Sequence, residues 1–196
     1  MKNFFKPVSI FCAALVLLTS CSSEEDNATT SSDFSIDNQS YTLLPSQGII
    51  EQKMNNMITE QGQTFDRSTI TISGTSGTNI GTVSFDLYYK DGLPVEGTYS
   101  IAETLDDNDA DFFDDLVTTQ KLCLGWTSMC AVFQGGSSVA VNANNPIGTV
   151  TVTKNSAANY TIQYNGNFRK YNSSFQVVGT VPVVVNITSN VLIQTI

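Results

Sequence analysis

The chain has 196 residues, carries a formal net charge of −9 and contains no histidine. Without an imidazole it cannot form Ser-His-Asp or Cys-His nucleophiles, His-ligated zinc sites or facial-triad iron sites. The excess of carboxylates argues against nucleic acid and against direct adsorption to anionic lipid, because both partners are negative themselves. Of the common hydrolytic designs, this composition leaves chiefly a pair of carboxylates.

Residues 1–20 have the pattern of a bacterial signal peptide. Lys2 and Lys6 form a positive n-region, and the apolar run 8–18 is shorter than the roughly 20 residues that a transmembrane helix needs. Removing these residues leaves seven Lys and Arg against 18 Asp and Glu, a net charge of −11. We therefore expect an exported protein whose own surface does not bind the membrane.

The segment Leu18-Thr19-Ser20-Cys21 ends the apolar run and resembles the bacterial lipobox. The resemblance implies that Cys21 becomes the mature N-terminus and carries diacylglycerol and acyl chains such as palmitate, so that the lipid is the membrane partner. An ordinary secretory signal with a coincidental cysteine is the alternative.

The residues after this cysteine are acidic. Ser22-Ser23-Glu24-Glu25-Asp26 resembles the export signal of Bacteroidota lipoproteins, which implies an outer-membrane location facing the cell exterior. A merely hydrated acidic segment is the alternative. Residues 21–35 together are too polar to bury much surface, so we expect a flexible tether there, followed by a single domain over residues 36–196.

Alternation of apolar and polar residues predicts that this domain is all-β. Turn residues are expected to separate the strands at Lys90-Asp91-Gly92, within 155–159 and at Asn165-Gly166. Roughly nine or ten strands at this spacing favour an antiparallel β-sandwich, with a partly open β-barrel as the alternative. The strands are expected around residues 70–72, 83–89, 97–102, 150–152, 160–164, 175–177, 183–187 and 191–193.

Two segments have features of short helices. Residues 49–60 carry apolar side chains at near-helical spacing, although 47–52 fits a strand equally well. Residues 109–117 fit a short helix capped by Asp107 or Asn108. We therefore expect at most one or two short helices.

Cys123 and Cys130 remain when Cys12 leaves with the signal peptide and Cys21 is lipidated. An even pair in an oxidising compartment favours a disulfide, with Gly125-Trp126 at the tip of a bridged hairpin or loop. Two separate buried thiols are the alternative. The spacing excludes a CxxC redox site, and the lack of further soft ligands argues against zinc.

Six carboxylates fall within residues 106–115: Asp106, Asp107, Asp109, Asp111, Asp114 and Asp115. They are either screened by water in an exposed loop or gathered by a hard cation such as calcium. An EF-hand is excluded, because Phe112 stands where the sharp turn needs glycine and Thr118 where a bidentate Glu is needed. We expect no cofactor, with a non-EF calcium loop as the alternative.

Several aromatic residues are candidates for a binding platform: Trp126, Tyr88, Phe168 and Tyr171. Flat apolar faces with polar groups beside them suit a sugar ring or a protein partner. Packing in the core or at strand edges is the alternative.

The lipobox, the acidic segment and strands such as 148–152 resemble the small single-domain β lipoproteins of Bacteroidota, a group without an assigned activity. This resemblance implies no catalytic residue. We therefore predict a lipid-anchored cell-surface protein that is structural or binds a glycan or a surface protein, rather than an enzyme. The alternative is a glycan hydrolase that uses some of Asp86, Glu96 and Glu103, although no acid/base pair is recognisable among them.

Overall fold

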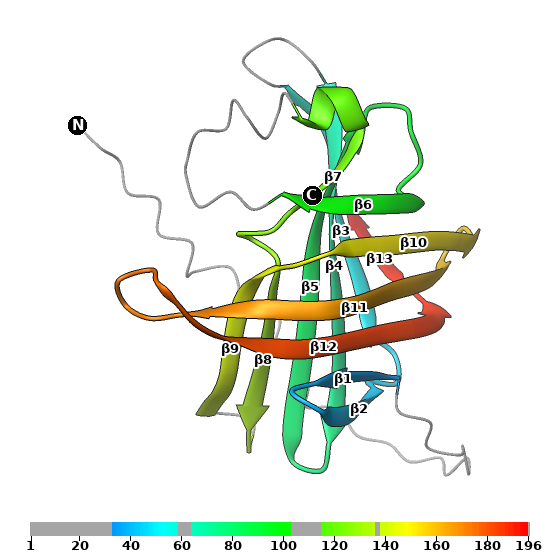
Figure 1. Ribbon diagram of the computed structural model, residues 1–196. Helices are drawn as coiled ribbons and strands as arrows, with labels where there is room; N and C mark the ends of the chain where they lie inside the picture. The colour runs from blue at the N-terminus through cyan, green and yellow to red at the C-terminus, as the bar shows by residue number, and fades with distance from the viewer. Residues whose placement is uncertain (1–32, 59–63, 103–114, 136–137, 196) are drawn as a thin grey trace. The chain divides into compact units, whose positions relative to one another are not determined.

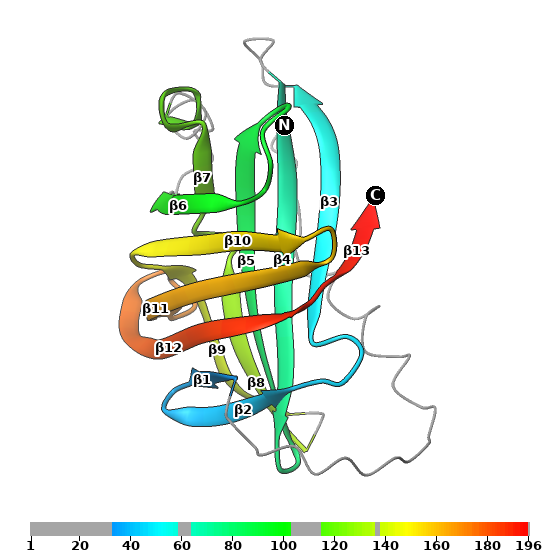
Figure 2. The ribbon, with the colours of Figure 1, turned by 90° about the vertical axis from the view of Figure 1, so that its right-hand side faces the viewer.

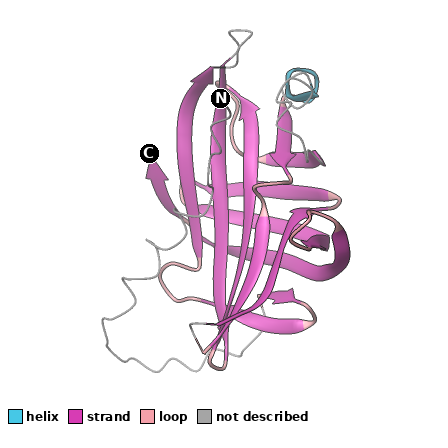
Figure 3. Ribbon diagram, turned by 90° about the vertical axis from the view of Figure 1, so that its left-hand side faces the viewer, coloured by secondary structure: helices cyan, strands magenta, loops and turns pink. Residues whose placement is uncertain are grey.

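The computed structural model describes residues 33–58, 64–102, 115–135 and 138–195, which belong to one compact unit. This part of the chain is all-β, as the alternation predicts, with a short helix at 115–119 (Figure 3). No helix in the described ranges has both the length and the apolar character needed to cross a membrane. The strands are β1 (Phe34–Ile36), β2 (Gln39–Leu43), β3 (Ile49–Ile58), β4 (Thr64–Ser76), β5 (Asn79–Lys90), β6 (Gly97–Ala102), β7 (Lys121–Leu124), β8 (Met129–Gln134), β9 (Ser138–Pro146), β10 (Thr149–Ser156), β11 (Asn159–Tyr171), β12 (Val177–Asn190) and β13 (Leu192–Thr195).

All of these strands belong to one hydrogen-bonded sheet that folds over itself into two layers. Their order is β10-β6-β7-β5-β8-β9-β11-β12-β1-β2-β4-β3-β13, and the additional pairings β10–β11 and β5–β4 curl the sheet into partial rings. Strands β3, β4, β5, β8 and β9 run along one layer, while β10, β11 and β12 cross over them in the other (Figures 1 and 2). The arrangement is sandwich-like and is not a regular closed barrel.

The central hairpin of β4 and β5 shows why the alternation is a reliable signal. Ile70 pairs with Phe85 and Ile72 with Val83, so the apolar positions of both strands point into the space between the layers. Most neighbouring strands are antiparallel, as predicted. The pairs β13–β3 and β6–β7 are parallel, which the sequence did not indicate.

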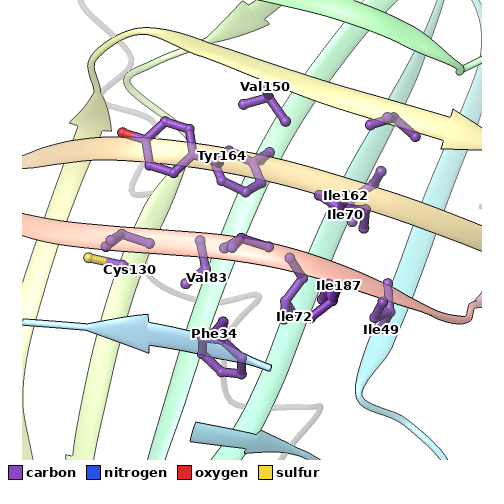
Figure 4. Packing of buried hydrophobic residues seen from close by; sticks show 14 of the residues in the cluster. Phe34, Ile49, Ile70, Ile72, Val83, Cys130, Val150, Ile162, Tyr164 and Ile187 are labelled. Carbon is purple, nitrogen blue, oxygen red and sulfur yellow. The ribbon is translucent and has the colours of Figure 1, made fainter. Parts of the chain in front are cut away.

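The core lies between the two layers, where aliphatic side chains from crossing strands interdigitate (Figure 4). Its aromatic centre is formed by Phe85, Tyr164 and Phe168, whose ring centroids are 5.1 to 6.0 Å apart. Such tilted and edge-on contacts are favourable beyond the burial of their area. A second, smaller cluster on the outer side of β5 consists of Phe65, Tyr88, Leu116 and Leu122.

The sequence left both a helix over 49–60 and a strand over 47–52 open. The structure has a strand at 49–58, because β3 is paired on both sides, with β4 and β13. One predicted turn is wrong. Asn165-Gly166 is not a turn, since β11 runs through both residues. A Cβ atom on Gly166 would lie 2.5 Å from the carbonyl oxygen of Ile147 and 2.6 Å from the Tyr164 hydroxyl, so glycine is needed for close packing instead.

Other local predictions are confirmed. Strand β6 covers the predicted residues 97–102, β5 ends at Lys90 before Gly92, and residues 157–158 form the turn between β10 and β11. The described part of the chain has more strands than the nine or ten expected. Strands β1, β2, β7, β8 and β9 lie outside the predicted strand ranges.

Candidate functional site

A buried ion pair fixes the turn that carries Trp126. Asp86 points to the outer face of β5, and its side chain is 1% exposed. Its carboxylate accepts hydrogen bonds from Arg67 Nε at 2.6 Å and from Arg67 Nη2 at 2.8 Å. The hydroxyls of Thr69 and Thr127 donate to the same carboxylate at 3.1 and 2.5 Å. Burial alone lowers the pKa of Arg67, but its hydrogen bond to Asp86 and the charge of Asp86 outweigh burial and raise this pKa, so the guanidinium stays charged.

The turn is held against the sheet by further bonds on both sides. The fully buried Ser128 hydroxyl accepts from the amide of Asp86 at 2.9 Å and donates to the carbonyl oxygen of Leu124 at 2.8 Å. On the other side, the Asn145 amide donates to the carbonyl oxygen of Gly125 at 2.9 Å. The backbone position of Trp126 is therefore fixed by β5 and by the end of β9.

Trp126, Tyr171 and Phe175 form a cluster that we call the aromatic surface. The ring centroids of Trp126 and Tyr171 are 5.7 Å apart in an edge-on arrangement, and those of Trp126 and Phe175 are 6.0 Å apart. The Tyr171 hydroxyl accepts a hydrogen bond from Nδ2 of the buried Asn145 at 2.9 Å. Trp126 and Tyr171 are half-buried, whereas Phe175 is 66% exposed.

Phe175 lies in the loop between β11 and β12, at the left of Figure 1, and this loop is ordered by Asn172. The side-chain oxygen of Asn172 accepts from the amides of Ser174 and Gln176 at 2.9 and 3.0 Å, and its carbonyl oxygen accepts from the amide of Phe175 at 3.0 Å. Phe175 has a φ of +59°, in the left-handed region that bulky residues rarely adopt. The loop thus holds an exposed phenyl ring beside Trp126 at a cost in backbone strain.

Only part of the predicted aromatic platform is brought together. Trp126 and Tyr171 meet, but Phe168 is buried in the main core. Tyr88 is covered by Leu116 of the helix at 115–119, and the guanidinium carbon of Arg67 lies 5.6 Å from the centroid of its ring. Phe175 was expected in a strand; the turn-forming Asn172 and the two serines after it were the signal that could have placed it in a loop.

The predicted disulfide is wrong, because Cys123 and Cys130 are separate, buried free thiols. Instead of forming a bridged hairpin, β7 and β8 pair end to end with the same edge of β5, Cys123 opposite Leu87 and Cys130 opposite Val83. Four residues along a strand span roughly 13 Å, whereas bridged cysteines need Cα atoms within about 7 Å. Burial raises the pKa of each thiol to about 12.

The other carboxylate candidates do not form a site in the described residues. Asp86 is occupied by Arg67 and two threonines, and Glu96 is exposed, with its carbonyl oxygen bonded to Lys121. Asp115 begins the short helix, where its carbonyl oxygen accepts from Thr119. Within the described ranges, no three acidic or cysteine side chains are grouped to hold a metal. Glu103, the remaining aspartates of the acidic run and the processing and export signals at 18–26 lie outside these ranges.

Neither a protein-family model, nor a curated protein sequence, nor a solved structure matches this chain.

Proposed function

We propose that this protein is a lipid-anchored binding protein of the cell surface that holds its ligand on the aromatic surface. The observation that carries the proposal is Phe175, a large apolar side chain that is 66% exposed in a left-handed backbone conformation. Such a conformation costs on the order of 1–3 kcal/mol and persists only where the surroundings impose it. A ligand that covers the Phe175 ring would remove from water the apolar surface that folding leaves exposed.

The size and chemistry of the aromatic surface favour a glycan. Three rings offer much less area than the roughly 800 Å² per partner of a standard protein interface. A sugar ring presents an apolar C–H face, which packs on aromatic rings, and hydroxyls at its edge, which bond to amides. Two amides lie beside the rings: Asn144 Nδ2 donates to the carbonyl oxygen of Trp126, and the side chain of Asn172 orders the loop of Phe175.

The membrane attachment rests on the sequence. The lipobox at Cys21 and the acidic segment 22–26 support an acylated protein that is displayed outside the outer membrane.

The geometry of Asp86 favours binding over hydrolysis, because a carboxylate that already accepts two bonds from a guanidinium and two from hydroxyls is not free to act as a general acid or base.

A glycan array tests this proposal with the intact chain and the variants Trp126→Ala and Phe175→Ala. We expect binding to a defined class of glycans, a loss of at least tenfold in both variants, and no released sugar. Val139→Ala, which also truncates an exposed apolar residue, is the control and should bind normally. Equal binding by all variants would refute the aromatic surface, released products would support the hydrolase, and capture of a surface protein through the same rings would change the ligand class.

A further inference from the structure

At one end of the sandwich the inward-facing positions change from apolar to polar on several strands at once. An alternating strand is expected to keep its inward positions apolar along its whole buried length. The inward positions run Ile49, Glu51, Lys53 on β3 and Val150, Val152, Lys154 on β10. Tyr160 and Tyr89 occupy the corresponding ends of β11 and β5.

The polar side chains at this end line a cavity of about 220 Å³ between the two layers. This volume is below the roughly 300–1,000 Å³ of sites for drug-sized ligands, so the cavity suits a metabolite of modest size. Its polar lining residues are Glu51, Lys53, Tyr89, Lys154 and Tyr160, and the rest of the lining is apolar.

Glu51 places a negative charge at the back of this pocket. The residue is 2% exposed, and its carboxylate accepts from the Ser68 hydroxyl at 2.6 Å and from the Tyr160 hydroxyl at 2.8 Å. Ser68 is in turn 2.9 Å from the Tyr89 hydroxyl. Burial, and then the bond to Glu51, raise the pKa of Tyr160, so this phenol remains a neutral donor.

No basic side chain neutralises this charge within the described part of the chain. Lys53, which lines the same pocket, pairs with Asp66 at 3.8 Å, and Arg67 pairs with Asp86 at 2.6 Å. A buried carboxylate is costly unless a cation compensates it, and hydroxyl donors alone do so incompletely. Glu51 therefore provides a site for a positively charged group that enters the pocket.

The mouth of the pocket carries the opposite charge. Lys154 is exposed, and its Nζ lies 6.0 Å from the centroid of the Tyr160 ring. It makes no ion pair with another described residue, whereas Lys53 is already engaged by Asp66. An anionic group on a bound ligand would thus meet the ammonium of Lys154.

We propose that this pocket binds a small zwitterion of the α-amino acid class, with its ammonium group directed at Glu51 and its carboxylate at Lys154. A neutral ligand leaves the charge of Glu51 without a counter-ion. A simple amine leaves Lys154 unmatched, and a simple anion is repelled by Glu51. The site is separate from the aromatic surface and does not depend on it.

Thermal shift and calorimetric titration of the intact chain in detergent test the proposal. The probes are the free amino acids, their methyl esters, which lack the carboxylate, and their N-acetyl derivatives, which lack the ammonium. We expect at least one free amino acid to bind at least tenfold more tightly than both of its derivatives. Failure of every free amino acid, or equal binding of its ester or N-acetyl form, would overturn the proposal.

Variants connect the binding to the named residues. Lys154→Met should weaken amino-acid binding at least tenfold, and Glu51→Gln should abolish it. Lys170→Met, at the other end of β11, is the charge-matched control and should have no effect. If Glu51→Gln fails to fold, Lys154→Met and the comparison with the methyl esters still test the proposal. Unchanged amino-acid binding by Lys154→Met would refute the assignment of the ligand carboxylate to Lys154. Phe175→Ala should leave amino-acid binding intact, which separates this test from that of the aromatic surface.

Discussion

The ion pair between Arg67 and Asp86 has partners of very different exposure, and this difference predicts an asymmetric response to mutation. The side chain of Asp86 is 1% exposed and that of Arg67 is 27% exposed. Arg67→Met leaves a buried carboxylate without its cation, whereas Asp86→Ala leaves a guanidinium that can turn toward water. We predict that Arg67→Met lowers the free energy of unfolding more than Asp86→Ala does.

The hydrogen bonds around the pair set the magnitudes. Losing one partner of a buried ion pair costs about 3–5 kcal/mol, which we expect for Arg67→Met. Asp86→Ala removes two bonds from the guanidinium and two from threonine hydroxyls, but Thr127 is exposed and Arg67 is partly so. Rehydration of these donors reduces the loss to about 2–3 kcal/mol. The double variant should be no less stable than Arg67→Met alone, which gives a coupling of about 2 kcal/mol or more.

Urea unfolding provides the assay, because Trp126 is the single tryptophan of the chain and lies in the turn that the ion pair holds. Lys53→Met is the matched control. It breaks the ion pair with Asp66 at 3.8 Å, in which the Lys53 side chain is 33% exposed, and should cost no more than about 1 kcal/mol. The reasoning would be refuted if both Arg67→Met and Asp86→Ala lowered the free energy of unfolding by less than about 1 kcal/mol. It would also be refuted if Asp86→Ala lowered it more than Arg67→Met does.

The remaining predictions concern the thiols, the N-terminus and the exposed ring. Burial raises the pKa of Cys123 and Cys130 to about 12, so both should resist alkylation in the native protein and react fully in urea without reductant; labelling that requires a reductant would show a disulfide. Cys21→Ser should abolish globomycin-sensitive processing and release the protein from membranes, and retention in the detergent phase would contradict lipidation. Replacing Glu24, Glu25 and Asp26 by Ala should reduce protease accessibility on intact cells; unchanged accessibility would make them a hydrated tether. Phe175→Gly should relieve the positive φ and raise the free energy of unfolding by up to about 1 kcal/mol, measured by urea unfolding, while it weakens glycan binding.

The elements that the sequence predicts well are those whose side chains alternate against a single core. Strands β4 and β5 are examples, because their buried apolar residues, Ile70 and Ile72 on β4 and Val83, Phe85 and Leu87 on β5, alternate with polar residues. Strands β7 and β8 are short, and apolar residues follow one another along them, as in Ala131-Val132-Phe133, so they show little alternation. The strand that pairs with β7 and β8 is determined by how the two layers cross, and the local sequence pattern does not encode this crossing.

Pairing of distant residues was the least predictable feature. The spacing of Cys123 and Cys130 suggested a hairpin, but the edge of β5 accepts β7 and β8 one after the other and keeps the thiols apart. Likewise, Asn165-Gly166 has the composition of a tight turn, whereas Gly166 serves a close approach to Ile147. In both cases a tertiary contact overrides a local signal.

Asp86 and Glu51 show how a structural buried carboxylate differs from a candidate ligand group. Both are almost fully buried, Asp86 on the outer face of β5 and Glu51 at an inward position of β3. Asp86 is matched by a guanidinium and by the hydroxyls of Thr69 and Thr127, so its charge is balanced within the fold and it positions a turn. Among the described residues Glu51 has only hydroxyl donors, and it faces a cavity, which is why we propose that the ammonium group of a ligand pairs with it. Charge compensation, rather than burial, is therefore what distinguishes a binding group from a structural one in this fold.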